Sequence, residues 1–418
     1  MEEIDTSRRA PFGSNPNVGE AGRATQQRIL AAADEAFAAD GYARTSVEAI
    51  TDLAGCSRPT FYQYFSGKED IHRRLAARFG AELAELLARM GPITNDRAGR
   101  DELCRWLEGL SDVHARYRAI ADNFAAAVRT DDQMVTGSSR LSAAYRDRLG
   151  QMITDPLPAT IPVEVLAAAI NATAYGAALY RVRVGNVDQE RLSAALADTI
   201  HRSLFGPIEG VNLGARVAAA PAPAAPEQSA PNDDDLRQSR GMATRAKLLD
   251  AAANAFGMLG YDGVRIDDIA AEAGVSHGTF YRYFSDKDAI YSQQADAVTA
   301  EAVALLASWP LNEEGDVRQW AKGYYELFGR LGGIIACLPE ARAAGLECAA
   351  RGRETTAAAL RKGLKDRSFG DTDADVVICF ALMENLAATA YRSLGISIDD
   401  AIEATALIVR RGIFAQPE

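Results

Sequence analysis

The chain has 418 residues, of which 48% are hydrophobic and 24% charged, and its formal net charge is -12. This length exceeds one ordinary domain, and the acidic balance excludes a protein that coats nucleic acid by bulk charge, so any DNA contact must use a local surface. The many Ala and Leu residues favour an all-α fold.

The five cysteines and four histidines form no metal or cofactor pattern. The cysteines include no CxxC pair and no zinc spacing with a histidine, which predicts buried thiols in a reducing cytoplasm and neither metal nor cofactor. The first twenty residues contain charges, Pro and Asn in place of an apolar signal segment, and Val165–Tyr180 is too short and polar for a membrane span. We expect a cytoplasmic protein with no membrane partner.

Two stretches of the chain repeat each other. The run ILAAADEAFAADGY, from Ile29, matches LLDAAANAFGMLGY, from Leu248, and the match continues without a gap at an offset of 219 positions. Trp320 follows Trp106 by 214 positions, which extends the similarity beyond these heads. The sequence therefore predicts two copies of one unit.

The segment between the copies contains APAPAAPEQSAPNDDD, whose composition cannot bury a core. Phe414 follows Phe205 by 209 positions, so the second copy carries two short deletions. The expected parts are 1–20 (disordered arm), 21–75 (first DNA-binding domain), 76–205 (first helical regulatory domain), 206–239 (disordered linker), 240–294 (second DNA-binding domain) and 295–418 (second regulatory domain).

The first head begins with two predicted helices. Thr25 is the expected N-cap of a helix that Gly41 ends. Thr45 and Glu48 form a capping box that opens the second helix, and Gly55 breaks it. A tight turn between two helices is then expected.

A short third helix follows, capped by Ser57. Phe61 and Phe65 are spaced i and i+4 and must face the core, which leaves polar and aromatic side chains exposed. The pattern is a helix-turn-helix, whose second helix enters the major groove of DNA. Ser66–Glu69 form another capping box, which places Lys68 where its ammonium group and a helix N-terminus both meet phosphate.

The run LAGCSRPTFYQYFSGKEDI and its counterpart AAEAGVSHGTFYRYFSDKDAI resemble the TetR family of transcriptional regulators. The resemblance covers the Gly turn, the aromatic core and the following Lys, and it occurs twice. It implies two tandem units, each with a three-helix head that binds double-stranded DNA and a helical domain that binds a small molecule and dimerises. The implied function is a repressor that an apolar or amphipathic effector releases from its operator.

The resemblance also implies which side chains contact DNA. Val264 stands where the first copy has Thr45, which removes a hydroxyl and predicts weaker binding by the second head. The implied DNA contacts of the first head are Arg44 and Thr45 on phosphate, Arg58, Pro59, Thr60 and Tyr62 at base edges with Ser57 and Gln63 beside them, and Tyr64 and Lys68 on the backbone. Those of the second head are Arg265, Ser276, His277, Gly278, Thr279, Tyr281, Arg282, Tyr283 and Lys287.

The two recognition helices differ at their N-terminal ends. Arg58 pairs with the two acceptors of guanine, whereas His277 cannot form that bidentate contact. We therefore expect an operator that is not a palindrome.

An aromatic stripe at helical spacing follows each head, and such a stripe is more often core than ligand cage. Only the family resemblance suggests a pocket there. His114 and His201 either line it or are ordinary partly buried histidines. The candidate ligand-binding residues are Trp106, Tyr117, Phe124, Trp320, Tyr324 and Phe328.

Each copy ends in two long predicted helices, at 162–182 and 188–205, then at 372–394 and 398–414. The helix at 162–182 is rich in Ala and has few large side chains, whereas its counterpart at 372–394 carries Phe380, Met383 and Leu386. Packing of small side chains on one helix against large side chains on the other favours pairing of unlike copies as an intramolecular pseudo-dimer. The alternative is a homodimer in which like copies pair across chains.

The sequence leaves two other functions open. An enzyme is disfavoured because the chain has no G-x-S-x-G, Walker A, G-x-G-x-x-G or H-E-x-x-H pattern. A ligand-binding or protein-interaction module with one or both heads inactive for DNA is favoured by the acidic charge and opposed by two intact recognition helices.

Overall fold

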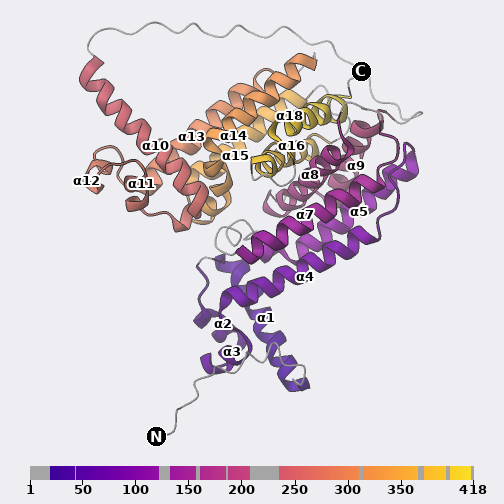
Figure 1. Cartoon of the computed structure of the whole chain (residues 1–418), viewed down its shortest axis with the longest axis horizontal. Helices are drawn as coiled ribbons and strands as arrows, with labels where there is room; N and C mark the ends of the chain where they lie inside the picture. The colour runs from indigo at the N-terminus through magenta and orange to yellow at the C-terminus, as the bar shows by residue number, and fades with distance from the viewer. Residues whose placement is uncertain are drawn as a thin grey trace. The chain divides into compact units, whose positions relative to one another are not determined.

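The computed structural model describes residues 19–42, 44–121, 132–156, 161–184, 187–207, 235–309, 314–365, 371–391 and 396–415 (Figure 1). These residues are helical almost throughout, and the one β contact among them is an isolated bridge between Ile93 and Ile153. The expected all-α fold is confirmed. The chain divides into two compact units, Met1–Ala88 with Asp112–Ser138, and Arg89–Ser111 with Ser139–Glu418.

Four helices beginning in the first unit form the first head. Phe37, Ile50, Phe61 and Phe65 are each at most 1% exposed and make up its core, as their spacing predicts. Gly55 ends the second helix in the left-handed region, with φ of 58°, which glycine adopts without strain. The helices are α1 (Glu20–Asp40), α2 (Val47–Ala54), α3 (Arg58–Tyr64) and α4 (Lys68–Ala88).

Two of the expected helix caps are wrong. α1 begins at Glu20, so Thr25 lies inside it and its hydroxyl donates to the carbonyl of Ala21 at 3.0 Å. Ser46 rather than Thr45 caps α2, because its hydroxyl accepts from a first-turn N–H at 3.1 Å. Spacing places a cap within about one turn, and the backbone of the preceding loop decides which side chain reaches the free N–H groups.

The second head lies in the second unit and repeats the first. Phe256, Ile269 and Phe280 are fully buried, and Gly260 interrupts the first helix with φ of 75°. That helix begins at Asp235, five residues before the expected boundary, while 208–234 and 1–18 lie outside the described residues. The helices are α10 (Asp235–Gly263), α11 (Ile266–Glu272), α12 (His277–Phe280) and α13 (Lys287–Leu306).

The remaining helices belong to the regulatory parts of the two copies. Within the second unit, α8 and α9 of the first copy contact α16, α18 and two π-helical segments of the second (Figure 1). Val163–Arg181 and Thr372–Tyr391 are long and apolar enough to cross a membrane, but most of each is buried inside the protein. The elements are α5 (Arg97–Arg116), α7 (Asp132–Met152), α8 (Val163–Val184), α9 (Gln189–Phe205), α14 (Glu314–Ala343), α15 (Glu347–Leu364), α16 (Thr372–Phe380), η2 (Ala381–Leu386), α17 (Ala387–Tyr391), α18 (Ile398–Leu407) and η3 (Ile408–Ile413).

Candidate DNA interface

The first recognition helix, α3, has a defined start. The Ser57 hydroxyl accepts from the Thr60 N–H at 3.2 Å and lies 2.9 Å from the Thr60 hydroxyl. Phe61 and Phe65 anchor the other face in the core, as expected, and Tyr62 is 50% exposed. Arg58, Pro59 and Gln63 are also exposed, so α3 presents a continuous polar and aromatic surface.

The second recognition helix repeats this frame but is shorter. Ser276 caps it with the same two contacts to Thr279, at 3.2 and 2.9 Å, and Tyr281 is again 50% exposed. α12 ends at Phe280, and the chain continues in a tighter turn in which Tyr283 N–H donates to the Phe280 carbonyl at 2.9 Å. Gly replaces Pro59 here, and glycine is a poor helix former.

Sequence reasoning missed a partner of His277. Nδ1 of His277 contacts Oδ1 of Asp267, which lies on α11. Both side chains are more than half exposed. The carboxylate therefore orients the ring and leaves Nε2 turned toward solvent. The counterpart of Asp267, 219 positions earlier, is Glu48, so no pattern distinguished the second head in advance.

Thr45, whose side chain was expected on phosphate, is buried in the head. Its side chain is 2% exposed, and its hydroxyl donates to the carbonyls of Ala36 at 3.2 Å and Gly41 at 2.8 Å. Val264 occupies the same buried place in the second head. The exchange of Thr for Val therefore alters the core, and it gives no reason for weaker DNA binding.

Lys68 also differs from its expected role. Nζ donates to the carbonyls of Tyr42 and Thr45, both at 2.9 Å, and lies 4.9 Å from the centre of the Tyr42 ring. Burial lowers the pKa of this ammonium group, and the charge of Glu69 opposes the shift. The side chain is directed into the α1–α2 loop, and its expected phosphate contact stays a prediction.

The second head contains the same lysine arrangement. Lys287 Nζ donates to the carbonyl of Tyr261 at 3.0 Å and lies 4.7 Å from that ring. The charge of the lysine is compensated locally by backbone carbonyls in both heads.

At the start of α4 the capping carboxylate also differs from expectation, because Asp70, not Glu69, accepts from the Ser66 N–H at 3.2 Å.

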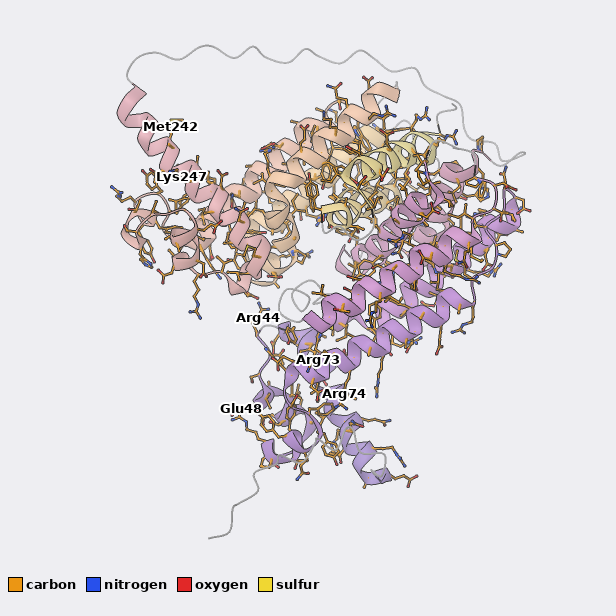
Figure 2. All side chains as sticks on the ribbon, viewed as in Figure 1. Arg44, Glu48, Arg73, Arg74, Met242 and Lys247 are labelled. Carbon is orange, nitrogen blue, oxygen red and sulfur yellow. The ribbon has the colours of Figure 1, made fainter. Side chains whose placement is uncertain are left out.

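The remaining predicted contacts lie at the surface. Arg44 is exposed just before α2 (Figure 2), and Arg265 is exposed at the N-cap of α11. Tyr64 and Tyr283 are half-buried. Gly278 and Arg282 are exposed on α12 and the turn that follows it.

The aromatic stripe of the second copy is buried. Trp320, Tyr324 and Phe328 on α14 are each at most 7% exposed, and Trp320 also packs against Trp309 with ring centres 5.0 Å apart. Burial raises the pKa of Tyr324. The indole N–H groups of Trp309 and Trp320 find no hydrogen-bond acceptor among the described residues. The stripe is therefore part of the core as it stands.

The candidates of the first copy divide between the two units. Trp106 is buried in the second unit, and Tyr117 donates from its hydroxyl to Glu82 Oε1 at 2.6 Å in the first. His114 packs edge-on against Phe79 at 5.1 Å, which is the contact of a core histidine. Phe124 lies outside the described residues.

Comparison with known proteins agrees with this arrangement. The sequence model of the bacterial regulatory proteins of the tetR family matches residues 29–75 and 248–293. The uncharacterised HTH-type transcriptional regulator YdgC of Bacillus subtilis is 38% identical over 56 residues, which are 13% of this chain and only 29% of that protein. The HTH-type transcriptional repressor AcnR of Corynebacterium glutamicum is 28% identical over 154 residues, 34% of this chain and 73% of that protein.

Two solved structures align with part of the chain. A TetR-family regulator from Syntrophomonas wolfei aligns with a TM-score of 0.35 and 18% identity, covering 46% of this chain and 99% of the other. FadR from Bacillus subtilis, solved in complex with stearoyl-CoA, aligns with a TM-score of 0.33 and 19% identity, covering 44% and 99%.

Two capped recognition helices, each anchored by a buried Phe pair, define a DNA-binding protein of the helix-turn-helix class. The chain carries the DNA-binding segment of the tetR family of bacterial regulatory proteins twice. It is a transcriptional regulator.

Proposed function

We propose that the protein is a cytoplasmic repressor whose two heads read the two unlike halves of one operator. The observation that supports this most directly is that the two recognition helices are anchored and exposed in the same way. Tyr62 and Tyr281 are exposed to the same extent above buried Phe pairs, while Arg58 and His277 differ at the ends that meet base edges. Two recognition helices with the same exposed surface but different base-contacting residues fit an operator with two unlike half-sites.

The revised contact set follows from exposure. Arg58, Pro59 and Gln63 offer base contacts in the first head, and Arg44 offers a phosphate contact. In the second head, the base contacts are His277 through Nε2, Gly278 through its backbone, and Arg282, with Arg265 on phosphate. Thr60 with Thr279, Tyr62 with Tyr281, and Tyr64 with Tyr283 complete the two surfaces.

We infer further that an apolar or amphipathic effector acts through α14. This helix carries Trp320 and Tyr324 in its first half, and its second half packs on the second head. Cys337 Sγ donates to the Phe256 carbonyl at 3.2 Å, and Tyr261 N–H donates to Glu340 at 2.7 Å. A ligand that separates the aromatic side chains would shift α14 and with it the head.

The contact between α14 and α10 is close enough to transmit a small displacement. A Cβ atom at Gly333 would lie only 2.8 Å from the Cα atom of Gly257. Because the two backbones touch with no side chain between them, a shift of α14 moves α10 directly.

Footprinting with the full chain tests the proposal. Genomic fragments flanking the gene should yield one protected site with two unlike half-sites. A footprint on a perfect inverted repeat would count against the asymmetric operator. Absence of any binding would favour a ligand-binding or protein-interaction module. Effector action is tested separately, by ligand-dependent change in melting temperature and DNA affinity across a metabolite panel.

A further inference from the structure

The helices that join the two copies cross at two points where equivalent residues face each other. Gly412 follows Ser203 by 209 positions and Asn385 follows Gly176 by the same 209, the offset that relates Phe414 to Phe205. Both pairs are in contact positions, at the α9–η3 and α8–η2 crossings. Contact between equivalent residues is what a two-fold axis between the copies requires.

Each crossing has glycine on one side only. A Cβ atom at Gly412 would collide with Ser203 Oγ and lie 2.7 Å from the carbonyl oxygen of Thr199. A Cβ atom at Gly176 would collide with the amide of Asn385 and lie 3.0 Å from the Cα atom of Ala381. The two glycines come from different copies, Gly176 from the first and Gly412 from the second.

We propose that these two crossings make the copies complementary to each other and incompatible with themselves, so that the partner of each copy is the other half of the same chain. At unchanged crossings, two first copies would place Ser203 against Ser203 and Gly176 against Gly176. Two second copies would place Asn385 against Asn385 and Gly412 against Gly412. Every like pair therefore contains one collision and one gap, both of which destabilise a close-packed interface.

A third contact also requires unlike copies. Tyr180 of the first copy donates its hydroxyl to Glu384 of the second, and Arg353 donates to the same carboxylate from Nη1 at 2.8 Å. The residue 209 positions after Tyr180 is Thr389, which has no phenol to offer. Glu384 would lose this donor in a pair of second copies, and a buried carboxyl group that loses a hydrogen-bond partner is costly.

Hydrogen bonds between α9 and η3 also support the pairing of unlike copies. Arg202 donates from Nε and Nη2 to the carbonyl of Gly412, at 3.1 and 2.7 Å. The close approach of the two helices here depends on the absence of a side chain at 412, which leaves Ser203 and Thr199 room against the η3 backbone. The inference rests on the proposed use of two unlike heads, and it specifies how one chain supplies both.

The test is a double-mutant cycle in the full chain, using Gly412→Ser, Ser203→Gly and the exchanged pair. Gly412→Ser should lower the melting temperature by about 3 to 9 °C, because it overfills the crossing. The exchanged pair should recover part of that loss, because it again sets Gly against Ser and removes the Ser203 hydroxyl, while the Thr199 carbonyl stays close to position 412. Gly150→Ser, where a Cβ atom meets nothing within 4 Å, is the matched control for the same change in a helix.

Light scattering supplies the second measurement. The wild type and the exchanged pair should both show the mass of one chain, 44.7 kDa. Equal melting temperatures for Gly412→Ser and the exchanged pair would overturn the complementarity, and a native mass of two chains would overturn the intramolecular partner. If Gly412→Ser does not fold, recovery of a folded exchanged pair supports the proposal, and its failure to fold overturns it. Neither readout uses DNA, so failure here is distinct from failure of the proposed regulatory function.

Discussion

Lys68 and Tyr42 are held together twice, by a hydrogen bond from Nζ to the Tyr42 carbonyl at 2.9 Å and by stacking of the ammonium group over the Tyr42 ring. We expect Lys68→Met to destabilise the first head by about 1–3 kcal/mol, because two carbonyls lose a charged donor. Hydrogen exchange of the α1–α2 loop measures the effect. Lys287→Met should act likewise on the second head. A fall of about 0.9 in the salt slope of DNA binding without any loss of stability would instead restore the phosphate role.

Tyr62 and Tyr281 provide a direct test of which heads bind DNA. Each ring is half exposed and is supported edge-on by the preceding Phe. Changing either Tyr to Ala should alter stability by no more than about 0.5 kcal/mol and lower operator affinity about tenfold. Phe61→Ala is the contrasting control, since it should cost about 3–5 kcal/mol of stability. Unchanged affinity for one Tyr variant would remove that head from the mechanism.

Asp267 is expected to sharpen the base preference of the second head. Asp267→Ala frees the His277 ring, so discrimination among bases at its position should fall, while overall affinity rises because a carboxylate near phosphate is lost. Nitrogen chemical shifts of the imidazole report the loss of the Nδ1 contact without DNA. Glu48→Ala in the first head is the matched control for the removed charge. Identical base preferences for the wild type and Asp267→Ala would contradict this role.

Glu384 predicts a pH dependence of the pairing between copies. Burial raises the pKa of this carboxyl group to about 8, above the ordinary value of 4.5. The folded protein therefore holds the proton more tightly than the unfolded chain, so this contribution is complete below about pH 4.5 and is lost as pH rises through 8. Melting temperature should fall between about pH 5 and 8 more steeply in the wild type than in Glu384→Gln. Parallel profiles for the two proteins would refute the assignment.

Local spacing was enough to predict the helices and the core of the heads. The i and i+4 spacing of Phe61 and Phe65 placed both in the core, and the glycine at 55 marked the turn between helices. These features depend on contacts within one or two turns of the chain, which sequence patterns record directly.

Other features depend on contacts between distant segments. Thr45 and Lys68 have surface-like residue types, yet both are directed into the loop after α1. The Asp267 partner of His277 lies ten positions away on another helix. The glycines at the two crossings became informative only when α8 and α9 were seen against η2 and η3. Residue type alone does not carry such tertiary information.

The α9–η3 and α8–η2 crossings have a consequence for how the two halves are supplied in the cell. A regulator made of two identical subunits tolerates any supply of its single subunit, whereas two halves that reject themselves need equal amounts of each. A single reading frame guarantees that equality at every expression level. On the proposed complementarity, deletion of either half leaves the other without its partner, so we expect neither half to be functional alone.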